Sequence, residues 1–178
     1  MGLLMSSFCL STVLVVQGQL KLFTMYSGMG KSSMAKYSET NLSDECVMVL
    51  KGFMSDMHDW ETECYKKSVE NFDDDLHGSD VEEVMRSELL NIFNKYVLKG
   101  GRNYDRVENL VCGRHPEYDE ESDQIEVVGV GEKGVSVVIK KTKGLASLFR
   151  LTLSLTDGVF MIASRELQSG GRWQKTYI

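Results

Sequence analysis

The side chains that most often bind metals or act as nucleophiles are scattered in this sequence. It contains the histidines His58, His77 and His115 and the cysteines Cys9, Cys46, Cys64 and Cys112. The cysteines form no CxxC pair and no zinc spacing, and no histidine pairs with a second histidine along a helix. Two segments with paired glycines, 28–31 and 129–131, lack the spacing and context of a phosphate loop. The sequence therefore predicts no metal site and no cofactor.

Carboxylates gather in two short segments, and neither has the alternating ligands and glycine of a calcium loop. Solvated turns and an acidic recognition surface both remain open as interpretations. Tyr118 favours recognition, because an aromatic side chain among carboxylates is typical of an interface anchor. The candidate recognition residues are Glu117, Tyr118, Asp119, Glu120, Glu121 and Asp123, with Asp73, Asp74 and Asp75 as a second patch.

The net charge of −6 is distributed unevenly along the chain. Residues 39–88 contain 15 acidic and four basic side chains, whereas residues 89–178 contain 11 acidic and 13 basic ones. Phosphates repel an acidic surface, so this pattern disfavours nucleic acid as a partner and favours a basic protein.

Hydrophobic periodicity predicts helices followed by an antiparallel sheet. Apolar residues recur every three or four positions from Ser43, the expected N-cap, to about Val69, and again between Ser79 and Gly100. A possible short strand at 110–112 precedes a polar loop. The predicted strands are 124–130, 135–139, 148–155, 159–167 and 172–178, with Asp157-Gly158 as a hairpin turn. We expect an α+β roll in which the long helix lies in the curve of the meander.

The N-terminal segment differs from the rest, so we divide the chain into an extension, 1–38, and one domain, 39–178. No Asp, Glu, His, Lys or Arg occurs before Lys21. A secretory signal lacks its positive n-region here, and polar residues interrupt the run too often for a membrane span. We hypothesise that Met34 is the biological start, because Gly30-Lys31 can be encoded by a purine-rich, ribosome-binding stretch.

Two cysteines bear on the compartment in which the protein works. Cys46 and Cys64, if carried by one helix, lie about 27 Å apart at the helical rise. This separation is far beyond disulfide reach. Reduced, buried thiols suit a cytoplasmic protein.

Four segments together resemble the NTF2-fold immunity proteins, which include partners of Rhs-type polymorphic toxins. They are 56–65, with its W-x-x-E-C-Y sequence, then 93–96, then the P-E-Y-D sequence 116–119, and finally 171–175. The resemblance covers about 42–178. It implies an NTF2-like (cystatin-like), cone-shaped roll without catalytic activity. It also implies a tight complex with one toxin domain, which protects the producing cell and its siblings. We expect the candidate recognition residues to form the toxin contact.

Two other classes of function remain open. Rolls of this type also host small isomerases and hydrolases, whose pocket holds a carboxylate base and a Tyr or His donor. The inward positions that we infer are apolar: Phe53, Met57, Trp60, Leu151 and Leu153. A structural or dimerisation module is the third possibility, and the sequence leaves open whether the protein is a monomer or a homodimer. A deep pocket with an inward acid favours the enzyme, and a filled roll with an acidic rim favours the binder.

Overall fold

The structure is a computed structural model that describes residues 42–70, 78–132 and 134–178. The second predicted acidic patch, Asp73 to Asp75, lies outside the described residues. The hypothesis about Met34 and the boundary between 1–38 and 39–178 lie outside them too, so these stay predictions.

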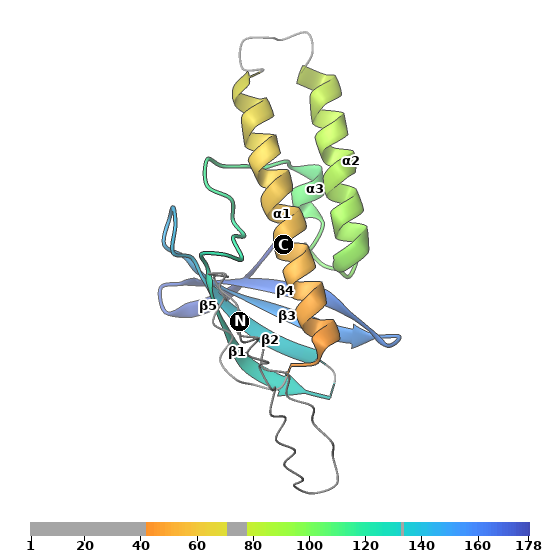
Figure 1. Ribbon diagram of the computed structural model, residues 1–178, viewed down its shortest axis with the longest axis vertical. Helices are drawn as coiled ribbons and strands as arrows, with labels where there is room; N and C mark the ends of the chain where they lie inside the picture. Colours follow the sequence, from red (N-terminus) through yellow and green to blue (C-terminus); the bar gives the residue numbers. More distant parts are fainter. Residues whose placement is uncertain (1–41, 71–77, 133) are drawn as a thin grey trace, which may run out of the picture. The chain divides into compact units, whose positions relative to one another are not determined.

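The described chain consists of helices followed by a sheet (Figure 1). The helices are α1 (Asp44–Glu70), α2 (Gly78–Tyr96) and α3 (Asp105–Glu108), and the strands are β1 (Gln124–Gly131), β2 (Gly134–Lys140), β3 (Leu148–Thr156), β4 (Val159–Ser169) and β5 (Arg172–Thr176). The five strands pair antiparallel in chain order. The predicted α+β arrangement is confirmed. Residues 109–123 join α3 to β1, and we call this segment the connector. The predicted short strand at 110–112 lies within it and is coil, so that prediction is wrong.

The two long helices form an antiparallel pair. Figure 1 shows α1 and α2 side by side, with the sheet crossing the first half of α1. Ser43 caps α1 as predicted, since its Oγ accepts the N–H of Cys46 over 3.3 Å. Trp60 packs between the helices and donates from Nε1 to the carbonyl of Met85 over 2.9 Å. The apolar stripe of α1 is therefore shared between α2 and the sheet.

The inner face of the sheet alternates as a half-buried sheet should. Val137, Phe149 and Leu151 are fully buried, and the predicted inward positions on α1 meet them from the other side. All five residues that were predicted to face inward are buried: Phe53, Met57, Trp60, Leu151 and Leu153. These positions form one hydrophobic core between helices and sheet.

A bulge in β4 changes which of its side chains point inward. Leu153 pairs with Ile162 and Thr152 pairs with Ser164, which leaves Ala163 as the extra residue. The carbonyl of Ala163 accepts a hydrogen bond from Asn103 Nδ2 over 2.9 Å. A bulge shifts the alternation by one residue, so the side chain three positions after Ile162 also faces the interior. That residue is Arg165.

Leu151 and Leu155 offer a matched test of this core, since both belong to β3 and one is fully buried while the other is 43% exposed. Leu151→Ala should lower the free energy of unfolding by about 3 kcal/mol through lost burial and a cavity. Leu155→Ala should lower it by less than about 1 kcal/mol. Urea denaturation of both variants checks this, and equal losses would contradict the assignment of the inner face.

Candidate functional site

Four charged side chains from separate parts of the chain meet beneath the connector. We call them the buried ion cluster: Glu61 of α1, Arg106 of α3, Glu117 of the connector and Arg165 of β4. Glu117 Oε2 lies 3.2 Å from Nη1 of Arg106, and its Oε1 lies 3.2 Å from Nη2 of Arg165. Arg106 also donates to one oxygen of Glu61, whose other oxygen accepts the N–H of Glu117. The cluster thus joins α1, α3, the connector and the sheet.

Burial determines the electrostatics of this cluster. The side chains of Glu61, Arg106 and Arg165 are almost completely buried, whereas 41% of the Glu117 side chain is exposed. Burial raises the pKa of the Glu61 carboxyl, and Arg106 counteracts this rise. Burial also disfavours charge on Glu117, but Arg165 and Arg106 outweigh it and lower its pKa. Each buried charge therefore has an opposite charge beside it, as burial of ions requires.

Tyr118 belongs to the core, so the prediction of an exposed aromatic anchor is wrong. Its side chain is fully buried, and its ring makes edge contacts with Phe53 and Phe149 at centroid distances of 5.0 and 5.5 Å. Its carbonyl oxygen is hydrogen-bonded to Nδ1 of His58 over 2.8 Å. The hydroxyl has no hydrogen-bond partner among the described residues, and burial raises the pKa of the phenol. The acidic neighbours of Tyr118 in sequence do not keep its ring at the surface.

Asp119 and Asp123 close the next turn of the connector. Asp123 Oδ2 accepts from Lys141 Nζ and from the N–H of Asp119, both over 3.0 Å. Asp119 accepts from the N–H of Ser122 over 3.1 Å and from Lys143 Nζ over 3.0 Å. Burial disfavours charge on Asp119, but the bonds from Ser122 and Lys143 outweigh it and lower the pKa of this carboxyl to about 2. The Asp123 side chain is fully buried, so its predicted place on an exposed surface is wrong.

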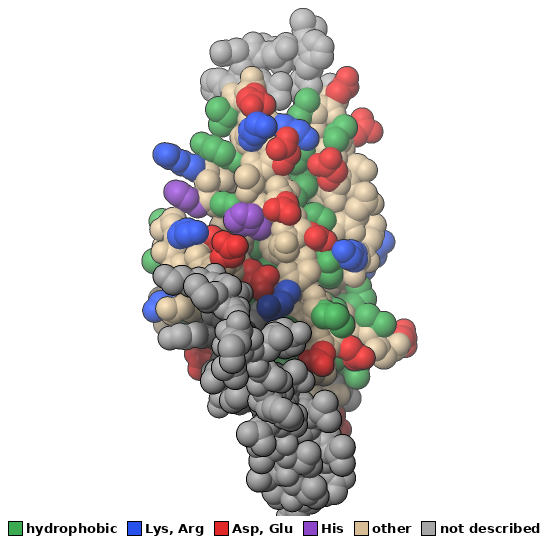
Figure 2. Space-filling model, viewed as in Figure 1, with side chains coloured by type: hydrophobic (Ala, Val, Ile, Leu, Met, Phe, Trp, Pro, Cys, Tyr) green, Lys and Arg blue, Asp and Glu red, His purple; other side chains and the backbone are tan. Residues whose placement is uncertain are grey.

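Besides the partly exposed Glu117, two of the predicted carboxylates reach the solvent at the tip of this turn. Glu121 is exposed, and Glu120 is partly exposed, with Oε1 2.9 Å from Lys51 Nζ. Together with Asp59 and His58 of α1 they border a surface hollow of about 410 Å³. We call this the acidic hollow. Figure 2 views the face with α1 in front and shows acidic side chains along it with fewer basic ones.

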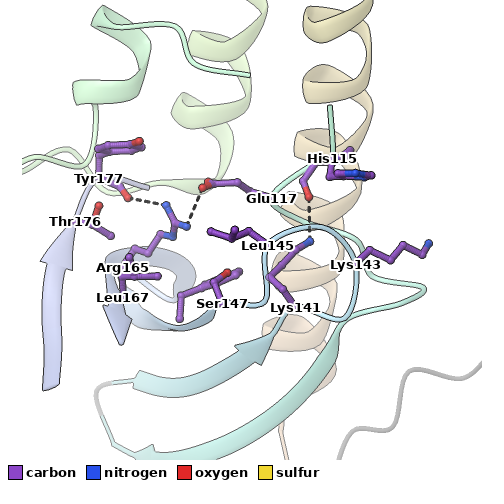
Figure 3. A pocket seen from close by; sticks show the side chains of 12 residues that line it. His115, Glu117, Lys141, Lys143, Leu145, Ser147, Arg165, Leu167, Thr176 and Tyr177 are labelled. Atoms are coloured by element: carbon purple, nitrogen blue, oxygen red, sulfur yellow. Dashed lines mark hydrogen bonds and ion pairs between the residues drawn. The ribbon is translucent and has the colours of Figure 1, made fainter. Parts of the chain in front are cut away.

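A second cavity, of about 240 Å³, lies between the connector, the β2–β3 turn and strands β4 and β5. Figure 3 shows the guanidinium of Arg165 reaching between Glu117 and Tyr177, with Lys141 approaching from the opposite side. Nη1 of Arg165 donates to the carbonyl of Tyr177 over 3.3 Å, and Lys141 Nζ donates to the carbonyl of Pro116 over 2.9 Å. We call this the Arg165 cavity. Among its lining residues the single carboxylate, Glu117, is already bound by two arginines.

An inward carboxylate and an inward phenol, which the enzyme alternative requires, are therefore present in Glu61 and Tyr118. Their environment is unsuited to acid–base catalysis. Each oxygen of Glu61 accepts a hydrogen bond, one of them from its counter-ion Arg106. Glu61 borders a separate cavity of about 200 Å³, and Tyr118 lines neither that cavity nor the Arg165 cavity. A base and a proton donor that act on one substrate must border the same cavity.

Most of these site residues were missed by sequence reasoning, although one of them left a signal. Glu61 lies four residues after Met57 and three before Cys64, which places a charge inside the apolar stripe of α1. A charged side chain at such a position indicates a buried ion pair. Arg106, Lys141 and Arg165 left no comparable signal.

The described residues contain no group of three or more His, Cys, Asp or Glu side chains arranged to hold a metal ion. Among the helices that the structure describes, none combines the length and the apolar character that crossing a membrane would need.

Glu61 and Glu63 lie on the same helix but differ in burial, so together they test how much the ion cluster contributes to the free energy of unfolding. Glu61→Gln should lower the free energy of unfolding by about 3 kcal/mol, because it leaves Arg106 buried with one counter-charge fewer. Glu63→Gln should change it by less than about 0.5 kcal/mol, since Glu63 is exposed and 3.8 Å from Lys67. Chemical denaturation at neutral pH measures both, and similar small losses would refute a stabilising role of the cluster.

Comparisons with known proteins bear on the whole described region. The family model described as NTF2 fold immunity protein matches residues 45–177. Neither curated proteins nor solved structures give a significant match. The matched segment contains α1 to β5 with both the ion cluster and the acidic hollow, and immunity proteins bind toxins and are not enzymes. The chain belongs to the NTF2-fold immunity protein family.

Proposed function

We propose that this protein binds and neutralises the C-terminal toxin domain of an Rhs-type polymorphic toxin, and so protects the producing cell and its siblings. Membership of an immunity protein family over residues 45–177 is the observation that carries this proposal. The proposed place of action is the cytoplasm, where free thiols such as those of Cys46, Cys64 and Cys112 stay reduced.

The proposed toxin contact is the acidic hollow. It retains Glu120, Glu121 and Asp119 from the predicted recognition residues and adds Asp59 and His58 from α1. In the part of the chain that the structure describes, neither Asp59 nor Glu121 forms an ion pair. These charges are available to a basic partner.

The connector holds this contact in a fixed geometry. Residues 116–119 are each attached to another element: Pro116 to Lys141, Glu117 to the ion cluster, and Asp119 to Lys143, while Tyr118 fills the core. A surface that is already ordered loses little conformational entropy when a partner binds. In this proposal the P-E-Y-D segment, 116–119, is a rigid scaffold that holds the two following carboxylates, Glu120 and Glu121, at the surface.

Charge favours a basic toxin surface. The region from 39 to 88, which includes α1 and the first part of α2, carries a large excess of acidic side chains. Such an excess attracts a basic protein over long range and speeds its association.

Co-expression tests the function directly. The toxin domain encoded immediately upstream is induced in cells with and without this protein. We expect growth to be restored and the two proteins to co-purify, because a bound immunity protein removes active toxin. If the toxin still kills while this protein is expressed and soluble, the assignment to that toxin fails.

Charge reversal tests the contact surface. Glu120→Lys combined with Glu121→Lys should slow association with that toxin about tenfold, since the steering field is reversed at the contact. The matched control combines Glu126→Lys with Glu132→Lys, two exposed residues at β1 whose reversal changes the net charge equally. Stopped-flow binding at low salt measures both rates. Equal rates for the two double variants would reject the acidic hollow as the contact.

A further inference from the structure

We propose that the Arg165 cavity and the exposed Leu145 at its rim form a second contact with the same toxin, in which the cavity takes up one acidic side chain. This inference rests on the proposed function and adds the chemistry that the toxin must present.

Leu145 is 90% exposed although the turn that carries it is firmly held. Lys141 N–H donates to the carbonyl of Ser147 over 2.9 Å and closes the turn, and Thr142 Oγ1 donates to the carbonyl of Ser122 over 2.7 Å. Gly144 adopts a left-handed φ of 70°, in close approach to His115. Single exposed leucines are common on protein surfaces. Leu145 differs because it lies on an ordered turn at the mouth of a charged cavity. A partner that covers it therefore does not pay the entropy of ordering the turn.

The Arg165 cavity offers more hydrogen-bond donors than its own acceptors use. Nε of Arg165 is buried without a partner among the described residues. Lys141 Nζ donates to Pro116 and to Asp123, which occupies two of its three N–H groups. Asp123, which neutralises Lys141, does not line the cavity. A guest that supplies acceptors and negative charge completes this arrangement.

A carboxylate fits this environment best. Three cationic side chains, Lys141, Lys143 and Arg165, line the cavity. Each is paired with one carboxylate, Asp123, Asp119 and Glu117 respectively, and of these only Glu117 lines the cavity. Hydrogen bonds from such cations to a carboxylate are short and about twice as strong as neutral ones. The volume of about 240 Å³ equals several water molecules of roughly 30 Å³ each, which leaves room for one acidic side chain.

The two contacts have opposite chemistry and meet at one residue. Lys143 lines both the acidic hollow and the Arg165 cavity. A partner that satisfies both must place basic groups over Asp59, Glu120 and Glu121. It must also place an acidic group in the Arg165 cavity, on the other side of Lys143. A toxin with basic groups at both positions meets repulsion at the second, which provides discrimination.

Thr176 allows a test that separates this contact from general charge attraction. It lies opposite Arg165 in the β4–β5 pair and lines the cavity. Thr176→Glu puts a carboxylate beside Arg165 and should weaken binding of the upstream-encoded toxin domain about tenfold relative to the matched Thr176→Gln. General attraction predicts the opposite sign, because the added negative charge favours a basic toxin. Calorimetric titration measures both dissociation constants.

Leu145→Ser should weaken toxin binding about 30-fold if this side chain is an anchor. The control is Leu155→Ser, an exposed leucine near the β3–β4 turn. The inference is overturned if wild type binds the toxin while Leu145→Ser binds equally well, or if Thr176→Glu binds as tightly as Thr176→Gln. Failure of the wild-type protein itself to bind is a different result, which refutes the proposed function and this inference together.

Discussion

The burial of Glu61, Arg106 and Arg165, with the partly exposed Glu117 as their second carboxylate, is the constraint on which the connector depends. Taking an ion out of water costs several kcal/mol, and this cost is offset only when opposite charges and hydrogen bonds surround it. Here the offset requires side chains from α1, α3, the connector and β4 to meet at one point. The connector therefore has one arrangement that satisfies all four charges. A coil segment between a helix and a strand acquires a fixed backbone without secondary structure of its own.

The sequence was sufficient for the layers of the fold, because local periodicity determines them. The apolar stripe of α1, its Ser43 cap and the alternation in β2 and β3 all appear in the structure as expected. Arg165 could not be predicted in this way. Alternation from Ile162 places Ser164 and Glu166 inward, and only the bulge at Ala163 brings Arg165 inside. The bulge in turn is held by Asn103, 60 positions away.

Tyr118 was misplaced for a related reason. Its neighbours Glu117 and Asp119 indicate a solvated loop when they are considered alone. In the fold, Arg106, Arg165 and Lys143 neutralise them, and these residues come from α3, from β4 and from the β2–β3 turn. Charge in a short segment is therefore a poor guide to burial when the opposing charges come from elsewhere. Glu120 and Glu121 at the tip of the turn are exposed or partly exposed.

The same residues explain why this roll suits binding better than catalysis. An enzyme interior keeps a carboxylate base and a proton donor beside the same substrate cavity. Glu61 and Glu117 instead hold arginines, and the Tyr118 hydroxyl is enclosed by the core. The interior polar groups that could act in catalysis instead hold the connector, and so the surface turn above them, in place. In the proposed complex this rigidity has a functional consequence. Acidic and donor-rich sites on either side of Lys143 keep a constant spacing, so a toxin is recognised by the order of its charges as well as by their sign.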